Sequence, residues 1–123
     1  MKLGFVTAIL PELDFENVLS FARHESFHCI EVACWPVGKA ERKYAGVTHI
    51  DVTSLTKTLA QDILARCQDQ GVEISALGYY PNMLDPNPEV SRQAVTHFKK
   101  VIKAINEFLS KGSFFFFKRI IVP

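Results

Sequence analysis

Apolar residues along this chain gather in two kinds of segment that alternate. Residues 2–7, 28–33 and 72–77 are short, mostly apolar runs with β-branched residues, and such runs predict β-strands. The stretches that follow carry apolar residues at every third or fourth position, which predicts helices with one buried face. The order of elements is therefore strand, helix, strand, helix, strand, helix.

The first two predicted helices have recognisable ends. Asp14 can cap the first, whose apolar face is made of Phe15, Val18, Leu19 and Ala22. Asp51 or Ser54 can cap the second, and Gly71 suits the left-handed position that ends a helix. The expected apolar face of the second helix consists of Leu55, Leu59, Ile63 and Cys67, with Ala60 and Leu64 beside it.

The third predicted helix has the clearest signature. Asn87 is the expected cap, Pro88 takes the first helical position, and Glu89 lies in the first turn, where negative charge is favoured. We expect Gly112 to end this helix and His97 to lie on its exposed side. The apolar stripe consists of Val90, Ala94, Phe98, Val101, Ile105 and Phe108.

Strands that alternate with helices favour a parallel α/β sheet. Two architectures fit this pattern: a doubly wound open sheet, or the opening of a (β/α)₈ barrel. The spacing of apolar residues does not separate them. In both, ligands bind beyond the carboxyl ends of the strands, so the segments that follow the three strands are the places to look for chemistry.

Composition narrows the function classes. The chain has 123 residues, a length typical of one domain, and a formal net charge of +1, which provides no overall field to attract nucleic acid or an anionic membrane. No segment approaches the roughly 18–20 apolar residues of a membrane span, and a secretory signal is missing, so we expect a cytoplasmic protein. The three cysteines form no CxxC pair and are expected to be reduced, buried hydrophobes.

The segment after the second strand, residues 34–53, is long for a loop in a compact domain. It combines aromatic and cationic side chains that could hold a sugar ring and a phosphate. The alternative is a solvated surface loop with a packing tryptophan. The residues in question are Trp35, Lys39, Arg42, Lys43, Tyr44, His49 and Asp51.

Two further candidates lie in or after strands. Glu31 is a carboxylate inside an otherwise apolar strand, which marks a functional group, a structural ion pair, or an outward position near water. Tyr79, Tyr80 and Asn82 follow the third strand and could hydrogen-bond sugar hydroxyls, or form an aromatic lid on the sheet edge. The four histidines make no metal-ligand set, so we expect no metal site in this chain.

Several stretches resemble the sugar phosphate isomerase/epimerase family, which belongs to the superfamily of xylose isomerase and AP endonuclease family 2. The similarity covers roughly residues 1–109. It is carried by IEVACWP at 30–36, GKAER at 38–42, YAGVTHIDV at 44–52, EISALGYYPN at 73–82 and LDP at 84–86.

The resemblance implies a TIM barrel and metal-assisted isomerisation or epimerisation of a sugar or polyol. Two carboxylates would move a proton beside a carbonyl, and a divalent metal (Mn, Mg, Zn or Co) would polarise the oxygens. The family's metal ligands come from later strands, so none is carried over to this chain. The expected substrate-contacting residues are Glu31, Trp35, Lys39, His49, Tyr79, Tyr80 and Asn82. Of these, we expect Glu31, Trp35, His49 and Tyr79 to converge on one face at the carboxyl ends of the strands.

The end of the chain departs from the family. We expect residues 1–112 to form the first part of a TIM-barrel domain, whereas residues 113–123, with four phenylalanines at 114–117, are either an altered tail or a fourth strand. A barrel needs about 250 residues, so we expect a truncated enzyme that is inactive alone. The alternatives are a non-catalytic half-barrel fragment or a small α/β module that binds a sugar or phosphate. An open strand edge and the phenylalanine run predict self-association.

Overall fold

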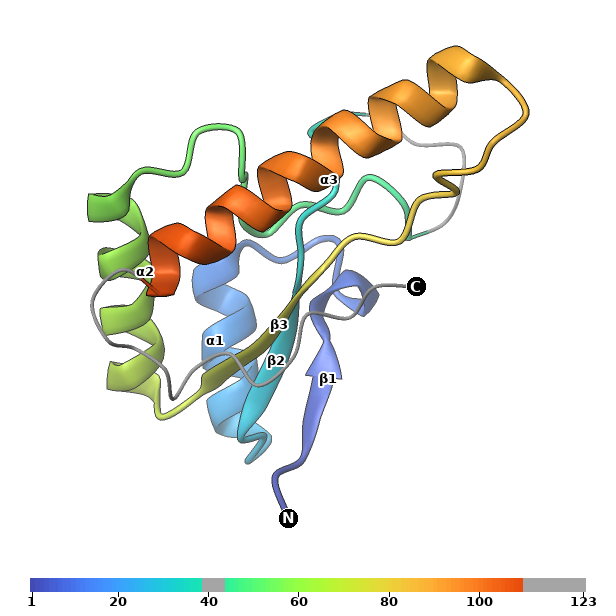
Figure 1. Ribbon diagram of the computed structural model, residues 1–123. Coiled ribbons are helices and arrows are strands. Elements are labelled where there is room, and N and C mark those ends of the chain that lie inside the picture. Colours follow the sequence, from blue (N-terminus) through green and yellow to red (C-terminus); the bar gives the residue numbers. More distant parts are fainter. Residues whose placement is uncertain (39–43, 110–123) are drawn as a thin grey trace.

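The computed structural model describes residues 1–38 and 44–109. It is a small α/β protein with a parallel sheet in the order β1-β2-β3, and Figure 1 shows the strands side by side. The predicted alternation of strands and helices is confirmed. The elements are β1 (Gly4–Val6), the short 3₁₀ helix η1 (Thr7–Ile9), α1 (Phe15–His24), β2 (Cys29–Ala33), α2 (Lys57–Gln70), β3 (Glu73–Gly78) and α3 (Pro88–Leu109).

The helix ends follow local hydrogen bonding. Asp14 caps α1 as expected, since its side chain accepts a hydrogen bond from the backbone N–H of Asn17 at 2.8 Å. The expected cap of α2 is wrong: Thr56 takes that position and accepts from the N–H of Leu59 at 3.1 Å. Asp51 instead closes its own turn by accepting from the N–H of Thr53 at 2.9 Å.

The buried faces of α2 and α3 differ in part from the expected stripes. On α2 the buried residues are Ala60, Ile63 and Cys67, whereas Leu59 is 40% exposed. On α3 the prediction for His97 is wrong, because this side chain is buried. Its Nε2–H donates to the backbone carbonyl of Cys34 at 2.7 Å, so a polar side chain can occupy the buried face.

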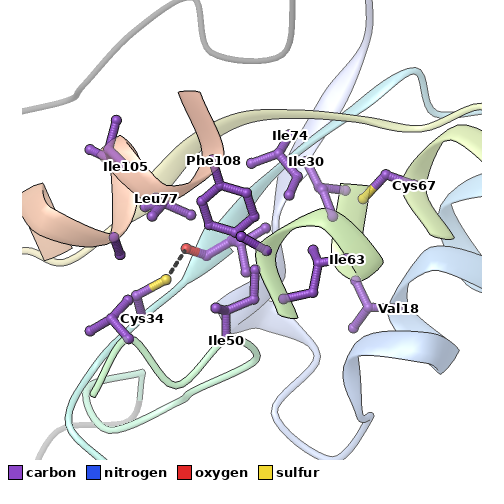
Figure 2. Close-up of a cluster of buried hydrophobic side chains, with 14 of the residues drawn as sticks. Val18, Ile30, Cys34, Ile50, Ile63, Cys67, Ile74, Leu77, Ile105 and Phe108 are labelled. Carbon is purple, nitrogen blue, oxygen red and sulfur yellow. Dashed lines mark hydrogen bonds between the residues drawn. The ribbon is translucent and has the colours of Figure 1, made fainter. Parts of the chain in front are cut away.

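All three helices contribute to one core that covers one face of the sheet (Figure 2). Phe108 of α3 is 1% exposed and belongs to the same cluster of buried side chains as Ile30 of β2 and Ile74 of β3. Along β2 and β3 the side chains that join this core are Ile30, Val32, Ile74 and Leu77. Phe5 of β1 faces the same side, since it pairs with Ile30 and contacts the ring of Phe21 on α1.

The register between β2 and β3 shifts within the sheet. Ile30 pairs with Ile74, but Glu31 pairs with Ala76, so Ser75 is an extra residue on β3. Its hydroxyl donates to the carbonyl of Ile30 at 3.1 Å. The shift puts Ala76 and Gly78, rather than their neighbours, on the sheet face that carries Glu31.

The structure is compatible with a partial βα arrangement, and three strands in sequential order occur in both architectures considered above. Residues 113–123, where a tail or fourth strand was expected, lie outside the described residues. Within the described part, none of the helices combines the length and the apolar character needed to cross a membrane.

Candidate functional site

A pocket of about 320 Å³ lies at the carboxyl ends of the strands, on the sheet face opposite the helices. All three strand ends contribute to it, together with η1 and the segment after β2. This is the edge at which ligands bind in parallel α/β proteins. The described lining residues are Val6, Ala8, Ile9, Glu31, Ala33, Trp35, Tyr44, Ala45, Gly78 and Tyr80.

Glu31 and Tyr80 form a hydrogen-bonded pair in this pocket. The hydroxyl of Tyr80 donates to Oε1 of the Glu31 carboxylate. Burial, reinforced by the hydrogen bond to the Glu31 carboxylate, raises the pKa of Tyr80 well above its ordinary value. Tyr80 is therefore a neutral phenol, and its hydroxyl proton is donated in the hydrogen bond to Glu31.

Gly78 leaves the space that the Glu31 side chain occupies. A Cβ atom at Gly78 would lie 2.8 Å from Oε1 and 3.4 Å from Cγ of Glu31. Any larger residue would therefore displace the carboxylate. The sequence reasoning missed Gly78, because alternation puts Ala76, Gly78 and Tyr80 on one face but does not show that this face carries Glu31.

Trp35 lines the pocket, and its ring packs against the ring of Tyr79. The two rings meet edge to face with centroids 5.0 Å apart. Tyr79 is 5% exposed, contacts the His97 ring at 4.6 Å, and donates its hydroxyl to the carbonyl of Ala94 at 3.4 Å. Burial raises its pKa. Tyr79 therefore packs between Trp35 and α3, on the opposite side of the strand from the Glu31 pocket.

His49 bridges two loops instead of lining the same pocket. Its Nε2 lies 3.2 Å from the carbonyl of Leu10 and 2.9 Å from that of Leu13, so this nitrogen carries the proton. Its Nδ1 then accepts from the hydroxyl of Thr7 at 2.8 Å, while Thr7 accepts from the N–H of Ala33 at 2.9 Å. His49 thus fixes the segment that carries Ala8 and Ile9 into the pocket.

The remaining expected site residues lie elsewhere. Asn82 is exposed and stabilises its own turn, because its side-chain oxygen accepts from the N–H of Leu84 at 3.1 Å. Lys39 lies outside the described residues. Asp51 is also engaged locally: the Thr53 hydroxyl donates to it at 2.6 Å and lowers its pKa. The structure therefore brings together Glu31, Trp35 and Tyr80 of the expected set.

The cysteine nearest the site is not a nucleophile in this setting. Cys34 is fully buried, and its thiol lies 3.4 Å from the carbonyl of Val32. Burial, followed by the nearby carboxylates of Asp51 and Glu31, raises its pKa far above the ordinary value. The thiol therefore stays protonated, and Cys34 packs as a small hydrophobe.

The described residues do not fit a divalent metal by themselves. Across residues 1–38 and 44–109, no three His, Cys, Asp or Glu side chains converge closely enough to hold an ion. Glu31 supplies the acidic group among the described lining residues of the pocket. The Glu31 carboxylate can accept hydrogen bonds from a ligand.

No protein-family model and no curated protein matches this chain.

Proposed function

We propose that this chain forms the first three βα units of a barrel of the sugar phosphate isomerase/epimerase kind. We further propose that the pocket lined by Glu31 and Tyr80 is part of its sugar-binding site. The observation that carries the proposal is the position of a carboxylate–tyrosine pair in a pocket at the carboxyl ends of three parallel strands.

The size and lining of the pocket support a small ligand of this class. Its volume, about 320 Å³, is near the lower end of the roughly 300–1,000 Å³ typical of small-molecule sites. Trp35 offers an aromatic surface for the apolar C–H face of a sugar ring. Glu31 offers carboxylate oxygens for its hydroxyl groups, and charge-assisted bonds of this kind are among the stronger ones.

The arrangement of helices supports the barrel part of the proposal. The strands follow one another in sequence order, and all three helices join the core on one face of the sheet. In a barrel the other face is the interior, and this is the face that carries Glu31. The proton transfer and metal binding implied by the resemblance would need groups beyond the three described strands.

The chain's single tryptophan, Trp35, gives a direct test of binding. We expect titration with D-fructose or D-glucose to change its fluorescence in a saturable way, because the ring lines the pocket. A variant with Glu31→Ala should lose most of this response, whereas Glu12→Ala, an exposed carboxylate outside the lining, should keep it. Unchanged fluorescence over the whole titration would contradict the proposal.

A second assay separates an enzyme from a binding module. Aldose–ketose interconversion is followed with Mn²⁺ or Mg²⁺ added. Turnover that is lost in Glu31→Ala would assign the family reaction to this pocket. Saturable sugar binding without turnover would favour the small α/β sugar-binding module over the isomerase.

A further inference from the structure

A second pocket, of about 470 Å³, adjoins the Glu31 pocket at the carboxyl end of the sheet. Trp35 and Ala45 line both pockets, so the two meet at these residues. The second pocket lies between the segment after β2, the residues that follow β3, and the first half of α3, and we call it the α3 pocket. The lining residues that matter below are Trp35, Pro36, Tyr79, Pro81 and Gln93.

The α3 pocket presents rigid apolar surfaces of the kind on which a sugar ring can pack. The Trp35 and Tyr79 rings meet edge to face with centroids 5.0 Å apart, and Tyr79 is 5% exposed, so the two rings support each other. Pro36 and Pro81 add the apolar faces of their own rings. The C–H face of a pyranose could therefore lie against this side of Trp35, just as another could on the side of the Glu31 pocket.

Gln93 of α3 adds an oriented polar group to this lining. Its side-chain N–H donates to the carboxylate of Glu89 at 2.9 Å, and Glu89 is also paired with Arg92. A primary amide has two N–H groups and a carbonyl oxygen, so after this bond Gln93 can still donate and accept. A sugar hydroxyl does both as well. Apolar walls with a small number of placed polar groups are the usual composition of a small-molecule site.

We infer that the α3 pocket is a second sugar subsite, and that the ligand is a reducing disaccharide whose two rings lie on either side of Trp35. The reducing sugar would occupy the Glu31 pocket and the other ring the α3 pocket. This rests on the proposed sugar-binding function and names its substrate class, since the reducing end retains the carbonyl that isomerisation requires. One stacking contact and one hydrogen bond together correspond to about a tenfold gain in affinity.

The test compares D-glucose with four reducing disaccharides of glucose that differ in linkage: maltose, cellobiose, isomaltose and gentiobiose. Affinities come from Trp35 fluorescence, and the site from amide shifts of the ¹⁵N-labelled chain. We expect at least one disaccharide to bind about tenfold more tightly than D-glucose. That disaccharide should shift the amides of Val90 and Gln93, which line the α3 pocket, whereas D-glucose should shift those of Glu31 and Tyr80 alone.

Gln93→Ala should remove about three- to tenfold of the disaccharide affinity and leave the affinity for D-glucose unchanged. Gln68→Ala is the matched control, because Gln68 is an exposed helical glutamine of α2 outside the described linings of both pockets. It should change neither affinity. Phenyl β-D-glucoside serves as a probe with an apolar second ring, and we expect it to bind more weakly than the best disaccharide.

The outcomes separate this inference from the proposed function. Disaccharides that bind no more tightly than D-glucose, or that leave the amides of Val90 and Gln93 in place, would overturn the second subsite and leave sugar binding in the Glu31 pocket intact. Equal loss of both affinities in Gln93→Ala would do the same. A phenyl glucoside that matches the best disaccharide would replace the second sugar with an apolar group. Failure of every sugar to bind would overturn the inference and the proposed function together.

Discussion

The carboxylate of Glu31, in the middle of β2, accepts a hydrogen bond from the hydroxyl of Tyr80, which lies two residues beyond the end of β3. The two residues are 49 positions apart in the sequence, and the fold brings them together on the sheet face opposite the helices. This contact links the fold to the proposed sugar site, because it orients the carboxylate and fills one of its acceptor positions.

Tyr80→Phe should weaken sugar binding by about three- to tenfold, since Glu31 loses its donor and can turn away from the productive orientation. Tyr79→Phe is the matched control, because its hydroxyl donates at 3.4 Å to Ala94 and not into the pocket. We expect sugar affinity in Tyr79→Phe to match that of the unaltered protein. Equal losses in the two variants, measured by fluorescence titration, would contradict a specific role for Tyr80.

Gly78→Ala should impair binding while leaving stability nearly unchanged. The added Cβ meets the flexible end of Glu31 at 2.8 Å, so the carboxylate can move aside and the strand can stay in place. At Gly4, by contrast, a Cβ would lie 2.4 Å from the backbone oxygen of Cys29, which cannot move without parting the strands. Gly4→Ala should therefore lower the free energy of unfolding by about 1–3 kcal/mol.

Thermal melts and sugar titrations on both glycine variants check this contrast. Retained affinity in Gly78→Ala would show that Glu31 does not need its present position. A large drop in the melting temperature of the same variant would show that the clash involves the sheet itself.

The stability of the protein should fall in alkaline solution, in part through Tyr80. Its pKa is raised in the folded state, so its contribution is complete below the unfolded value, roughly 10, and is lost as the pH rises through the folded value. Tyr80→Phe should therefore flatten the loss of unfolding free energy above pH of about 10. Denaturant unfolding at a series of alkaline pH values, compared between the two proteins, measures this; identical slopes would be evidence against the raised pKa.

Thr7→Val should destabilise the protein by about 1–3 kcal/mol, because it leaves the buried N–H of Ala33 and Nδ1 of His49 without their shared partner. Thr7→Ser keeps the hydroxyl and should retain most of that stability. Urea unfolding of the two variants gives the difference. Equal destabilisation of both would mean that the methyl group of Thr7, and not its hydroxyl, supports the loop.

Sequence periodicity predicted the order and approximate bounds of the elements, because each strand or helix needs only its own apolar spacing. It failed where partners come from distant segments. His97 looked like an exposed residue, yet its partner is the carbonyl of Cys34, 63 positions away. The cap of α2 was missed because Asp51, Ser54 and Thr56 are all suitable cap residues, and hydrogen bonding within the turn decides between them.

The candidate site was only partly predicted, again because some of its contacts join segments that are distant in the sequence. The apolar residues on both sides of Glu31 marked this carboxylate as unusual within its strand. The rule that ligands bind beyond the carboxyl ends of parallel strands pointed to Trp35 and Tyr80. The extra residue at Ser75 then decides which residues of β3 share a face with Glu31. Without that shift Tyr79, not Tyr80, would lie on the side of the carboxylate, and local spacing carries no sign of it.

The most direct test of the sugar-binding pocket is a two-dimensional NMR titration of the ¹⁵N-labelled chain with D-fructose. We expect saturable shifts in the backbone amides of Glu31, Trp35, Gly78 and Tyr80, while amides around the exposed Asn82 stay in place. Shifts that cluster at residues outside the pocket, or a spectrum that does not change with sugar, would contradict the proposed function.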